Sequence, residues 1–121
     1  MERRLRLRKS KDFQRIRRDG CVIRHPFVMV SYAPNHFDYN RYGFITSKHL
    51  GNAVVRNRVR RLLRESIRQL DPQIVNGYDM VFIGRNQIVE QPFYVIVRIL
   101  NELFNRAGLL GTLSTEDGIT S

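Results

Sequence analysis

Hydrophobic and polar residues follow two periods along the chain, and these periods predict helices and strands. Apolar residues recur at helical spacing in 11–19, 53–70 and 92–107. Extended stretches rich in β-branched and aromatic residues are 21–24, 27–33, 41–48 and 78–84. This order predicts one α+β domain with a single sheet over residues 1–108, followed by a flexible tail at 109–121.

Residues that favour helix ends mark the limits of the predicted helices. Ser10 is a suitable N-cap for the first helix, and Gly20 is a natural stop. Asn52 caps the second helix. We expect Pro72 to end that helix, because the residue before a proline, here Asp71, disfavours the helical conformation.

The pairing of the strands is predicted from the lengths of their connections and from their apolar content. A polar connection joins 27–33 to Arg41–Lys48 and is long enough for an open hairpin, so these two stretches are expected to pair. The stretch Tyr78–Gly84 is the most apolar of the strands. It is therefore expected at the centre of the sheet.

The second helix carries six arginines between Arg56 and Arg68, with Glu65 as the acid among them. At about 100° per residue, its packing side consists of Val55, Val59, Leu62, Leu63, Ser66 and Leu70. The polar side consists of Asn57, Arg61, Arg64 and Arg68, flanked by Arg56, Arg60 and Arg58. Arginines in the first turns oppose the helix dipole, and arginines four apart repel each other. The row therefore indicates a polyanionic partner.

The charge of the chain supports such a partner. The net charge is +10, and residues 1–68 hold 18 of the 21 basic side chains but 5 of the 11 acidic ones. Arginine outnumbers lysine 18 to 3, which favours bidentate pairing with phosphate and stacking on bases. Nucleic acid is the leading class of partner, and an anionic membrane surface is second. No apolar run approaches the roughly 20 residues of a membrane-spanning helix.

Side chains that would support protein-borne catalysis or metal binding are missing from the pattern. The acids are scattered, so we expect no two-metal nuclease site, no other metal site and no catalytic residue. His25, His36 and His49 lack the spacing of metal ligands. The single cysteine, Cys21, excludes an internal disulfide and favours the reducing cytoplasm.

Two adjacent motifs carry a resemblance to a known family. Phe44-Ile45-Thr46-Ser47-Lys48 precedes Gly51-Asn52-Ala53-Val54-Val55-Arg56-Asn57-Arg58-Val59-Arg60-Arg61. Together they resemble the signature of the protein subunit of bacterial ribonuclease P. The similarity extends to Phe13 with Gly20, to 27–29 and to 78–81. It implies an αβββαβα domain with a four-stranded mixed sheet and a left-handed βαβ crossover.

The resemblance also implies the partners. Proteins of this family bind the catalytic RNA and assist removal of the 5′ leader from precursor tRNA, with Mg²⁺ held mainly by the RNA and no obligatory protein partner. The residues expected to bind the RNA subunit are Arg56, Asn57, Arg58, Arg60, Arg61, Arg64 and, from the projection, Arg68. Those expected to bind the leader, in a cleft between the first helix and the sheet, are Phe13, Arg17, Lys48 and Arg85.

Three alternatives remain open from the sequence. Many relatives have an aromatic residue where this chain has Arg17, so Arg17 either stacks through its guanidinium plane or holds a phosphate, and Phe13 either stacks on a base or packs in the core. In function, the alternative is a non-enzymatic ribosomal or RNA-chaperone protein of similar fold. The motif at 51–58 favours ribonuclease P over that alternative.

Overall fold

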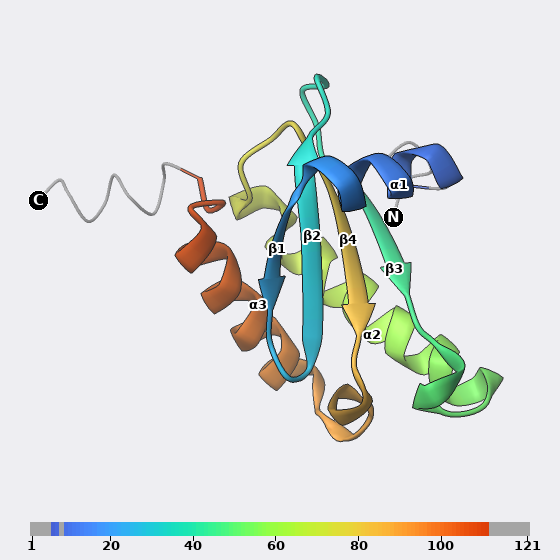
Figure 1. Cartoon of the computed structure of the whole chain (residues 1–121). Coiled ribbons are helices and arrows are strands. Elements are labelled where there is room, and N and C mark those ends of the chain that lie inside the picture. Colours follow the sequence, from blue (N-terminus) through green and yellow to red (C-terminus); the bar gives the residue numbers. More distant parts are fainter. Residues whose placement is uncertain (1–5, 8, 112–121) are drawn as a thin grey trace, which may run out of the picture.

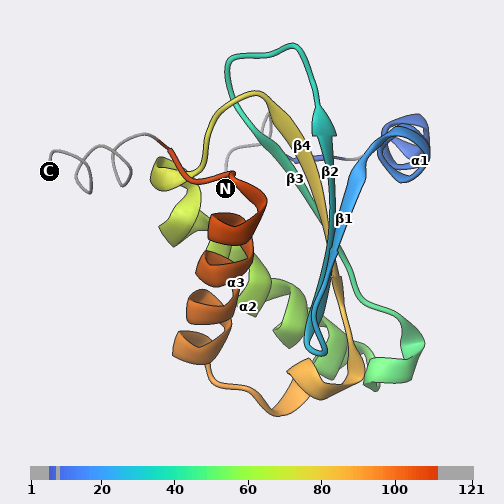
Figure 2. The ribbon, with the colours of Figure 1, turned by 60° about the vertical axis from the view of Figure 1, so that its left-hand side comes forward.

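A four-stranded sheet separates one helix from the other two (Figures 1 and 2). The structure, a computed structural model, describes residues 6, 7 and 9–111. Within this part of the chain the helices are α1 (Ser10–Asp19), α2 (Ala53–Leu70) and α3 (Phe93–Ala107). The strands are β1 (Cys21–Arg24), β2 (Val28–Pro34), β3 (Arg41–Ile45) and β4 (Tyr78–Gly84). Short 3-10 turns are η2 (Lys48–Leu50), η3 (Asp71–Gln73) and η4 (Asn86–Glu90). The predicted α+β class and element order are confirmed.

The order of strands in the sheet is β1-β2-β4-β3. The predicted hairpin between β2 and β3 is wrong, because β4 lies between them, antiparallel to β2 and parallel to β3. The apolar content of β4 explains this, since Met80, Val81 and Phe82 are all buried and an inner strand has neighbours on both sides. The predicted central place of β4 is confirmed. The parallel pair is joined through α2, and the left-handed sense of that crossover stays a prediction.

Side chains of β4 alternate between two hydrophobic clusters, one on each face of the sheet. Phe82 points to the side of α2 and α3, where its ring lies 5.6 Å from that of Phe44 and 6.1 Å from that of Phe104 between centroids. Val81 points to the side of α1 and packs in a smaller cluster with Ile16. The larger core therefore anchors α2 and α3, and α1 is held by fewer apolar contacts.

The two ends of α1 differ from the sequence prediction in their details. The helix begins at Ser10, with Lys9 at the N-cap position and no side-chain cap, so Ser10 does not cap it. Gly20 does end the helix, with an extended backbone (φ −92°). A Cβ at residue 20 would lie 2.5 Å from the carbonyl oxygens of both Ile16 and Tyr32. Close backbone approach, and not a left-handed conformation, therefore requires glycine here.

The end of α2 also has a different cause from the one expected. Asp71 keeps a helical backbone (φ −49°, ψ −43°) although Pro72 follows it, and the chain tightens into η3. The carboxylate of Asp71 accepts a hydrogen bond from the Tyr42 hydroxyl. Burial, and then this bond, raise the pKa of Tyr42, so the hydroxyl stays protonated as the donor. The 3-10 turn places Asp71 against β3.

The chain continues to pack beyond α3. Gly108 ends the helix with a left-handed backbone (φ 75°). Leu109 is buried, its carbonyl accepts a hydrogen bond from Val75 N at 2.7 Å, and Leu110 bridges to Ile74. The rest of the expected tail, 112–121, lies outside the described residues.

Candidate RNA-binding surfaces

The start of α2 is fixed by the turn that follows β3. Ser47 Oγ accepts a hydrogen bond from His49 N at 3.3 Å. Asn52 Oδ1 accepts one from Val55 N at 3.0 Å, which confirms the predicted cap. Gly51 has a φ of 144°, a conformation that is strained for any residue with a Cβ. This turn sets the angle at which α2 leaves the sheet edge.

The helix α2 has a buried side and an arginine-rich side. The buried residues are Val59, Leu63, Ser66, Ile67 and Leu70. We call the other side the arginine face; it is formed by Arg56, Asn57, Arg58, Arg60, Arg61, Arg64 and Arg68. Ile67 was not among the predicted packing residues. It is buried because α2 packs against α3 as well as against the sheet, which widens the covered side.

Some members of the arginine face are held by neighbours. Arg60 donates to Thr46 Oγ1 at 2.6 Å and also to Asn57 Oδ1, so Asn57 orients Arg60. Arg68 pairs with Glu65 at 2.8 Å, and both side chains are well exposed. An exposed pair of this kind contributes little to stability and leaves the guanidinium accessible. Asn57 therefore acts on the arginine face by orienting Arg60. Of the arginines of the face, Arg68 is the one whose charge is most neutralised.

Other members lack the acceptor that their burial demands. The Nε atoms of Arg56 and Arg64 are buried and have no hydrogen-bond partner within the described residues. Burial, followed by the charges of Arg6 and Arg60, lowers the pKa of Arg64. A groove of about 260 Å³ passes this cluster; its lining is Arg6, Leu7, Tyr42, Gly43, Phe44, Arg60 and Arg64. Three guanidinium groups and no carboxylate line it, so an anion would relieve their repulsion.

The segment before α1 contributes to this groove. Leu7 N donates to Tyr42 O at 2.8 Å, and Arg6 forms a parallel bridge with Tyr42. Leu7 is buried, so it anchors this extended segment to β3. Arg6 was not among the predicted RNA-binding residues. The alternation of arginine and leucine in this part of the sequence could have indicated it, because in an extended segment Arg6 and Leu7 lie on opposite sides.

On the opposite face of the sheet, α1 and the strands enclose a cleft, here called the α1 cleft. Its lining is Phe13, Ile16, Arg17, Ser31, Ile45, Val81 and Ile83. The predicted residues Phe13 and Arg17 are thus brought together. The enclosed space is about 20 Å³, which suffices for about one water molecule. The enclosed space is therefore too small for a nucleotide base, which would fit only at the rim or on the open sheet beside the cleft.

Phe13 has a packing role within this cleft. Its ring lies over Gly43, where a Cβ would come within 2.8 Å of Phe13 Cε1. The side chain is half-buried, in contact with the cluster around Ile16 and Leu7. Gly43 therefore admits the ring, and the ring seats α1 on β3. Part of Phe13 stays accessible at the rim.

A buried carboxylate holds α1 to the sheet. Asp79 is fully buried and accepts hydrogen bonds from Arg41 Nε at 2.8 Å and Arg41 Nη2 at 2.7 Å. It also pairs with Arg15 from α1 and accepts from Asn35 Nδ2 at 2.9 Å. The bond to Asp79 raises the pKa of Arg41. Two of the basic residues that the charge count assigned to a polyanion are thus neutralised inside the protein. An acid within the most apolar strand was the signal for such a cluster.

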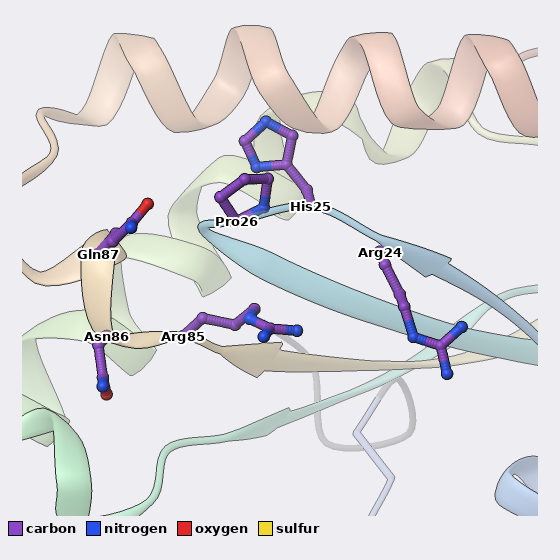
Figure 3. Close-up of a pocket in the computed structure, with 6 residues that line it drawn as sticks. All are labelled: Arg24, His25, Pro26, Arg85, Asn86 and Gln87. Carbon is purple, nitrogen blue, oxygen red and sulfur yellow. The ribbon is translucent and has the colours of Figure 1, made fainter.

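The two remaining predicted leader residues lie elsewhere. Lys48 is exposed on η2, outside the lining of the α1 cleft. Arg85 follows β4 and lines a groove of about 540 Å³, here called the distal groove. Its lining is Arg24, His25, Pro26, Arg85, Asn86 and Gln87 (Figure 3). Sequence reasoning did not connect Arg24 with Arg85, because β1 and β4 are distant in the sequence and do not pair with each other.

Within residues 6, 7 and 9–111, no group of three or more His, Cys, Asp or Glu side chains is arranged to hold a metal ion. None of the helices in the same residues combines the length and the apolar character required to cross a membrane.

Comparison with known proteins decides the family. The family model described as Ribonuclease P matches residues 1–108. The chain belongs to the ribonuclease P protein family. A curated relative from Roseiflexus castenholzii, the ribonuclease P protein component, is 45% identical over 111 residues and the match covers 91% of each chain. One from a Thermoanaerobacter species is 38% identical over 105 residues, covering 87% of this chain and 90% of the other.

Solved structures of the family share the fold. The RNase P protein of Staphylococcus aureus matches with a TM-score of 0.80 and 30% identity, covering 88% of this chain and 98% of the other. That of Thermotoga maritima matches with a TM-score of 0.74 and 30% identity, covering 81% and 94%. Members of the ribonuclease P protein family are subunits of the endonuclease that matures the 5′ end of tRNA. The ribosomal or RNA-chaperone alternative is therefore set aside.

Proposed function

We propose that the arginine face binds the catalytic RNA of ribonuclease P and that the region around the α1 cleft binds the 5′ leader of precursor tRNA. One observation carries this division. The guanidinium groups around Arg64 and the α1 cleft lie on opposite faces of one sheet, and neither lining contains a carboxylate. Two RNA segments can thus be bound at once.

The arginine face has the properties of a surface for structured RNA. Guanidinium groups pair bidentately with phosphate, and a rigid helix presents them in fixed positions. The buried Nε atoms of Arg56 and Arg64 have no acceptor within the described residues, and phosphate oxygens would supply one. Arg58, Arg60 and Arg61 complete the contact, with Asn57 holding Arg60. Arg6 extends the same surface beyond α2.

The α1 cleft has the properties of a surface for a single strand. Unpaired RNA is bound by planar or apolar side chains beside a basic track. Ile45 and Ile83 offer an apolar floor, and Phe13 offers a ring edge at the rim. Arg17 is exposed without a partner in the described chain, so it serves a phosphate or stacks through its plane. Lys48 and Arg85 extend the basic track.

The protein acts on the reaction by binding and orientation. No side chain of this chain is assigned as nucleophile, base or metal ligand. Mg²⁺ is held mainly by the RNA subunit, and the holoenzyme hydrolyses the phosphodiester that joins leader to mature tRNA in the cytoplasm. The protein supplies cations where two RNA molecules would otherwise repel each other. Its contribution is therefore largest when Mg²⁺ is scarce.

Cleavage of precursor tRNA by a bacterial ribonuclease P RNA, with and without the protein across a series of Mg²⁺ concentrations, tests this function. We expect a large stimulation at low Mg²⁺ that shrinks as Mg²⁺ rises. Binding is expected to weaken steeply with salt, as phosphate contacts require. Equal cleavage rates with and without the protein at every Mg²⁺ concentration would rule the function out.

A further inference from the structure

The face of the sheet that carries α1 is only partly covered. The helix packs on β2 and β4 near one end of the sheet, and none of the helices in the described residues covers the other end of this face (Figures 1 and 2). Cross-strand partners share a face, so Arg24, Met29, Ile83 and Ile45 form one row across β1, β2, β4 and β3. This row lies one pleat beyond the row of Val81, on which α1 rests. The exposed floor is thus apolar in the middle and ends at Arg24.

The distal groove continues this row. Arg85 lies two residues beyond Ile83, and its backbone N donates to Phe27 O at 3.0 Å. Arg85 lies four residues after Val81 of the α1 cleft, a distance of about 13 Å along a strand. In Figure 3, Arg24 reaches across β2 and Arg85 extends from the end of β4 toward it. The α1 cleft and the distal groove are therefore two ends of one open track.

The side chains of the distal groove are available to a ligand. Arg24 and Arg85 are exposed, and neither guanidinium has an acid or hydrogen-bond partner in the described part of the chain. No carboxylate lines the groove. The side-chain amides of Asn86 and Gln87, also exposed, add donors and acceptors. The groove thus offers two phosphate-binding groups beside groups that hydrogen-bond to base edges.

The side chain of His25 stabilises the turn between β1 and β2, so it is not counted among the ligand-binding groups of the groove. Its Nδ1 accepts a hydrogen bond from Phe27 N at 3.0 Å, and its ring meets that of Phe27 edge-on. Burial, followed by the charge of Arg106, lowers the pKa of His25. The imidazole is therefore neutral at pH 7, and the positive charge of the groove belongs to its two arginines.

We propose that the distal groove is a second binding site for single-stranded RNA, which holds a leader nucleotide farther from the cleavage site than the one at the α1 cleft. The position follows from the sheet. The arginine face lies beside β3, at one edge, whereas Arg24 lies on β1, at the other edge. A strand that leaves the catalytic RNA beside β3 and crosses the sheet toward β1 passes Arg85, which follows β4, and reaches Arg24 last. This inference rests on the proposed function, because it extends the track of the leader.

Binding of precursor tRNAs with a stepwise series of leader lengths, assembled with the protein and catalytic RNA, tests the proposal. Arg24→Ala is expected to weaken binding of long-leader precursors about fivefold to tenfold, as for one lost charged contact. Short-leader precursors and mature tRNA should bind as they do to the wild type. Arg98→Ala, which removes an exposed charge from α3, is the matched control and should have no length-dependent effect.

A second arm tests the amides. An abasic nucleotide at the leader position where the Arg24→Ala effect first appears should weaken binding to the wild type and have a smaller effect on Asn86→Ala. Equal behaviour of Arg24→Ala and Arg98→Ala at every length overturns the distal site, and so does equal weakening of mature tRNA by Arg24→Ala. If the wild type itself shows no preference for leader-bearing over mature tRNA, the proposed function fails instead.

Discussion

The helices α1 and α2 both carry arginines, but the two helices use them in different ways. On α1, Arg15 turns inward and pairs with Asp79, which is fully buried. On α2, Arg56 and Arg64 have buried Nε atoms without an acceptor in the described residues. One arginine completes a contact within the protein, and the others leave a contact open.

The two helices differ in whether the carboxylate nearest to their arginines is buried or exposed. A buried carboxylate requires cations, so arginines beside Asp79 stabilise the fold. The carboxylate beside the arginine face, Glu65, is exposed and pairs with Arg68. Net charge counts both kinds of arginine alike, whereas burial of the acid separates them. The comparison therefore predicts which arginines affect stability and which affect RNA binding.

The largest effect is expected from Asp79→Asn. The change leaves Arg15 and Arg41 beside a neutral amide in the protein interior. Removing one partner of a buried pair costs 3–5 kcal/mol, and since both arginines are partly exposed we expect about 3 kcal/mol of unfolding free energy. Urea denaturation measures it. The matched control is Glu65→Gln, which breaks an exposed pair and should cost less than about 0.5 kcal/mol.

If Asp79→Asn and Glu65→Gln destabilised the protein equally, the buried cluster would not be what holds α1 to the sheet. The division between structural and RNA-binding arginines would then lose its physical basis.

An intermediate effect is expected from removing one arginine of each kind, Arg61 from the arginine face and Arg15 from the buried cluster. Arg61→Ala should weaken binding to the catalytic RNA by about 1–2 kcal/mol, as for a lost charge-assisted contact, and leave the unfolding free energy unchanged. Its dependence of log K on log salt should become shallower by about 0.7–0.9. Arg15→Ala should lower the unfolding free energy and leave that salt dependence as in the wild type. RNA titration at several salt concentrations, with urea denaturation of both variants, separates these outcomes. A shallower salt dependence for Arg15→Ala would show that Arg15 also contacts RNA.

The sequence was sufficient where the determinants are local. The limits of α2 follow from Asn52 and from a helical period over many residues, and the structure has both. The central place of β4 follows from its apolar content. In contrast, the cap at Ser10 failed because short helices depend on their docking, and α1 is placed by Phe13 and Asp79.

Features that depend on pairing between distant segments could not be predicted. Hairpin reasoning joined β2 to β3, because connection length does not reveal that β4 returns between them. Arg24 and Arg85 come together only through that strand order. Asp79 was different, since a lone acid in an apolar strand indicates a buried carboxylate that needs cationic partners. Of the candidate site, the composition of the arginine face was therefore predictable, and the grooves around it were not.

The smallest effect sharpens the comparison within α1 itself. Arg17 lines the α1 cleft, whereas the next residue, Arg18, pairs with Asp19 at 3.0 Å on an exposed surface. Arg17→Ala should weaken binding of leader-bearing precursor by about 1 kcal/mol, since one charged contact is lost, and leave mature tRNA unaffected. Arg18→Ala removes the same charge from the same helix and should change neither. Competition binding of the two RNAs to each assembled variant measures the difference. The two side chains carry the same charge on the same helix, but only Arg17 lines the α1 cleft. An equal loss from both would therefore mean that the leader responds to the charge of α1 as a whole, and that the α1 cleft does not position it.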